Sequence, residues 1–158
     1  MTRRLEFGKV TDRKPPFRYS ALTRVAFSET DAQGIVYYGR YMPYFDLARV
    51  EYHRHLGVEG VKASGYDFVM RANTVEYFAP AQFDDLIEVF VRLSRVGSTS
   101  VTYEYHAWRV EDDVLMVTAQ QTLVLVDLAK RSPVPIPPEF KQVFLEFEAD
   151  GLHVGAPR

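Results

Sequence analysis

One carboxylate, Asp31, lies in a glycine-containing turn before an aromatic-rich segment, in the stretch SETDAQGIVYYGRYMPYFDLARVEYHRHLG at 28–57. An aspartate in such a turn can brace it by accepting hydrogen bonds from nearby backbone N–H groups. It can also serve as a base or nucleophile. Free N–H groups around Tyr38 and Gly39, at the start of a predicted helix, would form an anion site within its reach, and Gly39 leaves room for a ligand. The turn by itself leaves both interpretations open.

Other catalytic arrangements find little support in the sequence. His53 and His55 are two residues apart on a predicted helix and point in different directions, while His106 and His153 have no acidic partner at ligand spacing. We therefore interpret all four as structural or solvated and expect no metal site. No serine lies in a G-x-S-x-G context, and no glycine-rich phosphate loop is present.

Composition limits the class of protein. The chain has 158 residues, a formal net charge of -2 with both signs interspersed, and no cysteine. These values predict one domain without a nucleic-acid partner, and they exclude disulfides and thiolate nucleophiles. No run approaches the roughly 18 apolar residues of a membrane span, and the basic start is followed by polar, proline-interrupted sequence rather than an export signal. We expect a soluble, cytoplasmic protein.

A long helix is predicted over about 40–56, ending at Gly57. Its apolar residues recur at spacings of three and four, and Leu47 and Val50 widen the apolar face, which is typical of a helix wrapped by other structure. The residues of the repeat are Tyr41, Tyr44, Phe45, Ala48, Tyr52 and Leu56.

Strand-like runs surround this helix in the sequence. One run covers 19–27, and the four that follow the helix are 67–79, 85–96, 99–111 and 114–127. The short links between them predict an antiparallel meander, and a short helix follows Pro138. The expected fold class is α+β, an antiparallel sheet of five or more strands wrapped around the central helix. Exposed edges of such a sheet favour dimerisation.

A run of residues at 29–57 matches a known pattern. Its matching positions are Glu29, Asp31, Gly34, Ile35, Val36, Tyr37 and Tyr41, followed by Ala48, Arg49 and Glu51. The run resembles the signature of the 4-hydroxybenzoyl-CoA thioesterase family of hotdog-fold proteins, which includes acyl-CoA thioesterases associated with the Tol-Pal system. The resemblance implies a hotdog domain over 19–150. The polar and basic residues 1–18 predict an arm or an edge strand rather than core, and residues 151–158 are expected to form a C-terminal tail. The resemblance also implies a homodimer or homotetramer with active sites at a dimer interface.

The same resemblance assigns roles to residues. Asp31 would be the catalytic nucleophile or general base, and the backbone N–H of Tyr38 would polarise the thioester carbonyl. No cofactor is expected beyond the coenzyme A that forms part of the substrate. A thiolate leaves readily, so no strong general acid is needed. The substrate-binding positions implied are Gly34, Val36, Gly39, Tyr41, Arg92 and Arg95.

Several alternatives remain open from the sequence. Arg92 and Arg95 could meet the phosphates of coenzyme A, with Arg131 a looser candidate, or they could simply be solvated strand ends. Arg40 stands where many relatives carry asparagine. The substrate could be a carrier-protein thioester, or the domain could bind an acyl thioester without catalysis. A hydratase would need a histidine in the turn, which the sequence lacks. The acyl group is not readable from the sequence.

Overall fold

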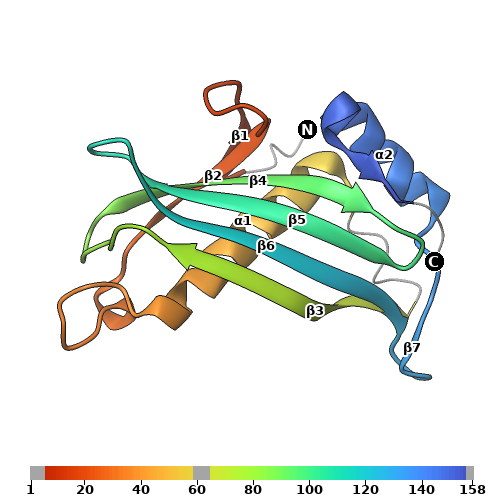
Figure 1. Ribbon diagram of the computed structural model, residues 1–158, viewed down its shortest axis with the longest axis horizontal. Helices are drawn as coiled ribbons and strands as arrows, with labels where there is room; N and C mark the ends of the chain where they lie inside the picture. The colour runs from red at the N-terminus through yellow and green to blue at the C-terminus, as the bar shows by residue number, and fades with distance from the viewer. Residues whose placement is uncertain (1–5, 59–64, 156–158) are drawn as a thin grey trace, which may run out of the picture.

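A computed structural model describes residues 6–58 and 65–155 as one α+β domain. Figure 1 shows a twisted sheet with a long helix behind it and a second helix at one end. The helices are α1 (Tyr41–Leu56) and α2 (Pro138–Glu148), with short 3₁₀ turns η1 (Phe27–Glu29), η2 (Tyr38–Arg40) and η4 (Ala149–Gly151). The strands are β1 (Gly8–Val10), β2 (Tyr19–Arg24), β3 (Tyr66–Tyr77), β4 (Leu86–Val96), β5 (Ser100–Arg109), β6 (Val114–Asp127), β7 (Ser132–Pro133) and β8 (His153–Val154).

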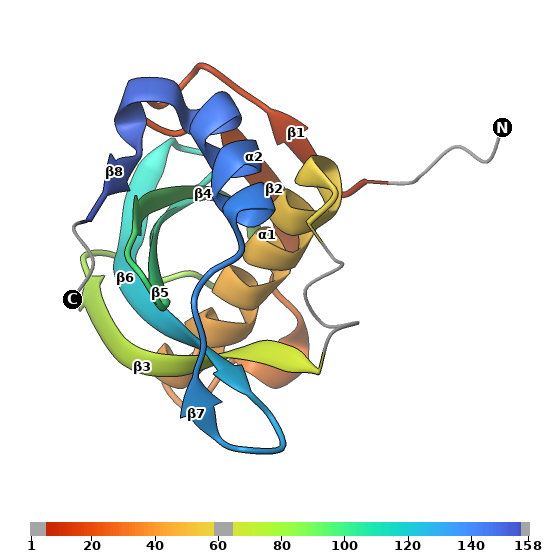
Figure 2. The same ribbon diagram turned by 90° about the vertical axis from the view of Figure 1, so that its right-hand side faces the viewer.

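The sheet curls around α1. Its main strand order is β1-β2-β4-β5-β6-β3, with every neighbouring pair antiparallel. Seen from its end, the curved sheet holds α1 in its hollow (Figure 2). Phe45 and Ala48 of α1 are fully buried, as are Val89 and Val91 of β4. The predicted hotdog architecture, a sheet wrapped around a central helix, is confirmed.

Helix α1 begins and ends close to the predicted positions. Gly57 closes it in the left-handed conformation at φ 72°, and the N–H of Val58 donates to the carbonyl of His53 (3.1 Å). The predicted width of the buried face is wrong, because the side chains of Leu47 and Val50 are 36% and 49% exposed. The sheet covers one side of the helix, and these two residues lie on the side that it leaves open.

The position of β3 corrects the predicted meander. Strands β4, β5 and β6 follow one another as neighbours, but β3 pairs with β6 at the far side of the sheet. A short link does not force neighbouring strands to pair when the sheet is strongly curved. Residues 78–85, at about 3.3 Å each, can span roughly 26 Å. They leave β6 where Phe78 donates to Met116 and reach β2 where Val25 donates to Asp85. As a result, β3 forms a long edge of the sheet.

The N-terminal segment covers part of the outer face of the sheet. Phe17 is buried, with its ring centroid 4.7 Å from that of His106 and 6.1 Å from that of Phe90. Burial of His106 lowers its pKa. Phe90 therefore points away from α1, as the strand alternation predicts, and is nevertheless fully buried.

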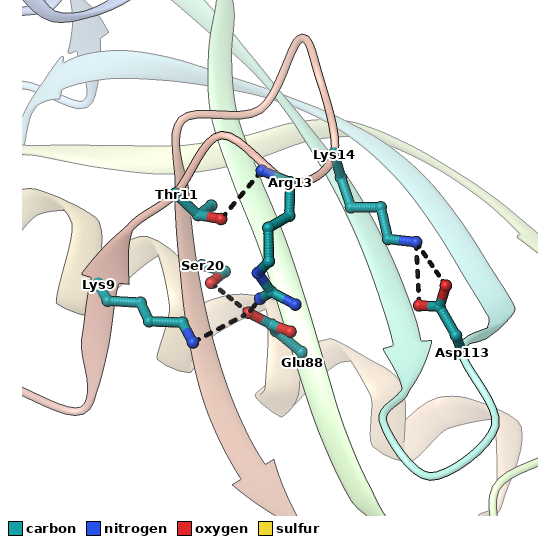
Figure 3. Close-up of polar contacts among 7 residues, drawn as sticks. All are labelled: Lys9, Thr11, Arg13, Lys14, Ser20, Glu88 and Asp113. Atoms are coloured by element: carbon teal, nitrogen blue, oxygen red, sulfur yellow. Dashed lines mark hydrogen bonds and ion pairs between the residues drawn. The ribbon is translucent and has the colours of Figure 1, made fainter.

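Polar contacts hold the same segment in place (Figure 3). The carboxylate of Glu88, which is 5% exposed, accepts hydrogen bonds from Arg13 and from the hydroxyl of Ser20 (2.7 Å). Lys14 pairs with Asp113 (2.9 Å). Residues 6–18 thus form a fixed part of the domain surface.

Candidate active site

The loop between β2 and α1 is attached to the domain at both ends. The N–H of Val25 donates to the carbonyl of Asp85 (2.9 Å), and the N–H of Val36 donates to the carbonyl of Ala81 (2.8 Å). An isolated β-bridge joins Thr30 to Val36. The loop is therefore folded back on itself, with Asp31 on one side and the start of the helix on the other.

Asp31 forms a tight turn within this loop. Its N–H donates to the carbonyl of Ile35 (2.9 Å), and its Oδ1 accepts a hydrogen bond from the N–H of Gln33 (2.8 Å). Gly34 completes the turn at φ 76°, where other residues are strained. The turn-bracing interpretation of Asp31 is thus correct. Its Oδ2 makes no hydrogen bond to any residue that the structure describes, so half of the carboxylate is available for other contacts.

Two backbone donors lie at the other side of the loop. Tyr37 donates its N–H to Glu29 (3.0 Å), and Arg40 donates to Tyr37 (2.8 Å). Between them, the N–H groups of Tyr38 and Gly39 have no acceptor within 6–58 and 65–155. They begin η2, which continues directly into α1. Unpaired N–H groups at a helix start suit an oxyanion.

Aromatic side chains fix these donors in space. The hydroxyl of Tyr77, on β3, donates to the carbonyl of Tyr38 (2.9 Å). The hydroxyl of buried Tyr41 accepts a hydrogen bond from the N–H of Ala81 (3.2 Å). Burial raises the pKa of Tyr41, so its hydroxyl stays neutral at ordinary pH. Val36 and Tyr41 therefore both anchor the loop to Ala81, which is a positioning role.

The two candidate arginines lie at the opposite end of β4. Arg92 pairs with Glu104 (2.9 Å) and donates to the carbonyl of Gly151 (2.8 Å), which holds the C-terminal segment against the sheet. Arg95 borders a hollow of about 220 Å³ that it shares with Arg71. The length of β4, at about 3.3 Å per residue, separates this end from Asp31 by roughly 30 Å. Within one chain, therefore, Arg92 and Arg95 do not lie near the loop that holds Asp31.

A larger cavity of about 380 Å³ was not predicted from the sequence. It lies between the second half of α1 and the start of β3. His53 contributes to it, with Nε2 2.6 Å from the hydroxyl of Tyr103, a contact that the sequence did not predict. The spacing of Arg49 and His53, four residues apart on one helix face, was the available signal. The lining residues are Arg49, Val50, His53, Arg54, Val58, Asp67, Phe68, Tyr103, Leu123 and Phe140.

A family model described as the thioesterase-like superfamily matches residues 25–144, which include the loop, α1 and the sheet from β3 to β6. The chain belongs to the thioesterase-like superfamily. The predicted thioesterase family is thereby confirmed, and Asp31 lies within the matched region.

Relatives of this thioesterase support the assignment. It is 34% identical to the acyl-CoA thioester hydrolase YbgC of Escherichia coli O6:H1 over 127 residues, covering 79% of this chain and 92% of that protein. It is 32% identical to the acyl-CoA thioesterase YbgC of Haemophilus influenzae over 129 residues, covering 80% and 93%. A solved hypothetical protein from Aquifex aeolicus superposes with a TM-score of 0.72 at 31% identity, covering 79% and 98%.

Two further observations describe the thioesterase. Within the described residues, no three histidine, aspartate or glutamate side chains are placed to hold a metal ion. Of the helices that the structure includes, none has the length and apolar character to span a membrane.

Proposed function

We propose that this thioesterase hydrolyses acyl-CoA to a carboxylic acid and free coenzyme A, using Asp31 and the backbone N–H groups of Tyr38 and Gly39. The observation that supports the proposal is the loop between β2 and α1. On one side it holds Asp31, whose Oδ1 alone is hydrogen-bonded within the described residues, and on the other it holds the unpaired N–H groups of Tyr38 and Gly39. The activity named for the YbgC relatives supports the same substrate class.

The chemistry follows from this arrangement. The thioester carbonyl oxygen accepts hydrogen bonds from the Tyr38 and Gly39 amides, which stabilise the negative charge that develops on it. Asp31 either attacks the carbonyl carbon, giving a mixed anhydride that water hydrolyses, or removes a proton from an attacking water. In both routes the C–S bond breaks and the thiolate leaves. A thiol pKa of about 8.5 makes that step possible without a strong general acid.

A second copy of the chain is part of the proposal. The edge strand β3 is 12 residues long, and Val69 and Met70 on it are 44% and 46% exposed. Leu47 and Val50 on α1 are exposed as well, and Val50 borders the same cavity as Phe68 of β3. Long exposed edges with apolar residues pair readily, and a two-fold axis makes such pairing antiparallel.

Antiparallel pairing would unite the separated parts of the site. Strand β3 starts at the end of the sheet where β4 finishes, so Tyr66 and Arg95 lie at one end and Tyr77 at the other. In the pair, the partner's Arg95 therefore comes to the end that holds Asp31. Arg95, with Arg71 and the hydroxyl-rich turn at 98–100 beside it, is suited to the phosphates of coenzyme A. Arg92, held by Glu104, is suited less well.

Coenzyme A release from a panel of short, medium, long and aromatic acyl-CoAs, together with an acyl carrier-protein thioester, tests this function. We expect turnover of at least one acyl-CoA. If only the carrier-protein thioester is turned over, the substrate is an acyl carrier-protein thioester rather than acyl-CoA. If acyl-CoA binds without any turnover, the domain is a binding module instead of an enzyme.

A further inference from the structure

The aromatic ring of Tyr37 lies directly against the backbone of Gly39, at the start of η2. A Cβ added at Gly39 would have this ring as its three nearest contacts, at 2.9 Å from Cε1, 3.4 Å from Cδ1 and 3.9 Å from Cζ. The backbone of Gly39 is outside the left-handed region, so its conformation would not strain a larger residue. What the glycine permits is therefore the close approach of the ring. The expectation that Gly39 leaves room for a ligand is wrong on this side, because the ring fills that room.

Neighbouring groups hold Tyr37 in this position. Its N–H donates to the carbonyl of Glu29 (3.0 Å), and its carbonyl accepts the N–H of Arg40 (2.8 Å). Its ring centroid lies 4.4 Å from that of Tyr38. A hydrogen bond with the Tyr38 hydroxyl raises the pKa of Tyr37, so the phenol is neutral at ordinary pH. The part of Tyr37 that faces Gly39 is thus an uncharged aromatic ring.

This ring lies beside the two backbone donors of the loop. The N–H groups of Tyr38 and Gly39 have no acceptor in the part of the chain that the structure describes. A Cβ is joined to its own backbone nitrogen through Cα alone, so a ring edge at the Cβ position of Gly39 is also close to the N–H of Gly39. Water at such donors competes with a ligand oxygen and screens its charge, whereas donors shielded from water stabilise a developing negative charge more strongly.

We propose that Tyr37 is a positioning residue, whose ring shields the N–H groups of Tyr38 and Gly39 from water on one side and so strengthens their hydrogen bonds to the thioester oxygen as negative charge develops on it. The inference rests on the proposed function. The ring acts through the two amides and takes no part in bond making or breaking. Because the ring rather than the hydroxyl is required, phenylalanine should replace Tyr37 without loss.

A double-mutant cycle tests the role of the ring. We measure kcat and KM for the best acyl-CoA substrate with Tyr37→Ala, Gly39→Ala and the double variant. The Cβ of Gly39→Ala pushes the ring away without straining the backbone, so this variant should match Tyr37→Ala. Each should lower kcat about tenfold, less than the roughly 10²–10³-fold loss on removing a donor, with KM within about threefold of wild type. In the double variant the added Cβ has no ring to displace, so kcat should be no lower than in Tyr37→Ala.

Two further variants serve as controls for the cycle. Tyr37→Phe keeps the ring and should retain kcat within about twofold of wild type. Phe83→Ala removes an aromatic ring of similar exposure, which packs against Phe27 at a centroid distance of 5.8 Å. It should leave kcat unchanged.

Amide exchange with water gives a readout that does not depend on turnover. In NMR measurements at neutral pH, the N–H groups of Tyr38 and Gly39 should exchange at least about threefold faster in Tyr37→Ala than in wild type. The N–H of Gln33, which donates to Asp31 in the same loop, should exchange at the same rate in both proteins.

Four results would overturn the inference. Unchanged exchange of both amides in Tyr37→Ala would show that the ring does not shield them. A double variant that loses the product of the two single effects would show that the Cβ of Gly39→Ala obstructs the substrate itself. A raised KM at constant kcat would make the ring a wall for substrate binding. Equal losses in Tyr37→Phe and Tyr37→Ala would assign the effect to the hydroxyl.

Failure of the proposed function gives a different pattern. Wild type would then hydrolyse no thioester, while the faster amide exchange of Tyr37→Ala would persist. That combination refutes the thioesterase reaction at this loop and leaves the shielding of the amides in place.

Discussion

Asp31 shares its local bonding with another aspartate of the chain. The carboxylate of Asp31 accepts a hydrogen bond from the N–H of Gln33 (2.8 Å), and the carboxylate of Asp127 accepts hydrogen bonds from the N–H groups of Ala129 and Lys130 (both 2.9 Å). Both side chains brace a turn. Asp31 differs in its surroundings, because the unpaired amides at the start of η2 lie across the same loop. The role of this residue is therefore decided by its neighbours rather than by its own conformation.

Gly34 and Gly57 provide a test at matched backbone geometry. Their φ angles are 76° and 72°, and a Cβ added at either position meets nothing within 4 Å. Alanine at each site should lower the free energy of unfolding by about 1 kcal/mol through backbone strain alone. Gly34→Ala should also reduce thioester turnover, because it distorts the turn that holds Asp31, while Gly57→Ala should not. Urea unfolding and a turnover assay check both expectations, and equal turnover of the two variants would contradict them.

Glu148 gives the protein a pH-dependent stability. It is fully buried on α2, where burial raises its pKa above 4.5, and Tyr52 donates a hydrogen bond to its Oε1. A carboxyl group with a raised pKa binds its proton more tightly in the folded state, so stability falls as pH rises through the folded pKa. Glu148→Gln should therefore gain stability relative to wild type as pH increases from 4 to 8. A stability difference that is constant over this range, measured by urea unfolding, would contradict the assignment.

Helices and strands that depend on a local sequence pattern were predicted correctly, whereas the pairing of strands far apart in the sequence was not. The spacing of apolar residues in α1 and the alternation in β4 are properties of a short segment, and both predicted elements agree with the structure. The pairing of β3 with β6 depends on the curvature of the whole sheet, which no single segment encodes. The exposure of Leu47 and the burial of Phe90 have the same origin, because each depends on which distant segment covers a face.

The parts of the candidate site likewise differ in how well the sequence predicts them. The Asp31 loop is continuous in sequence, so its parts could be predicted together. The cavity combines α1, β3, β5, β6 and α2, and its polar contacts join residues such as His53 and Tyr103 that are far apart in the chain. Of these features, the sequence alone shows only the four-residue spacing of Arg49 and His53.

The N-terminal segment should stabilise the domain without taking part in chemistry. Phe17 is 2% exposed and fills the outer face of the sheet beside Phe90. Phe17→Ala should lower the free energy of unfolding by about 3 kcal/mol, as is usual for a buried phenylalanine. Turnover per folded molecule should stay within about twofold of wild type, because this face lies on the other side of the sheet from α1. A large loss of turnover in fully folded protein would instead connect the segment to the site.

For the whole molecule, the open edge at β3 predicts an assembly. Met70→Lys places a positive charge on this edge strand. In a pair of identical edges the second copy would add the same charge, and such charges oppose strand pairing. We expect the variant to sediment as a monomer with reduced turnover. Val110→Lys is a suitable control, because Val110 is similarly exposed, at 40%, and follows β5 rather than lying on β3. A wild-type monomer with full activity would remove the dimer from the proposal.

Steady-state release of coenzyme A by Asp31→Asn, measured beside wild type and Asp127→Asn, tests the role of Asp31. The asparagine oxygen can still accept the N–H of Gln33, so the turn should persist while the carboxylate is lost. We predict that kcat falls by about 10²–10⁴-fold in Asp31→Asn, the usual contribution of a catalytic base, and stays near wild type in Asp127→Asn. An Asp31→Asn variant that retains kcat within about tenfold of wild type would contradict a catalytic role for this carboxylate.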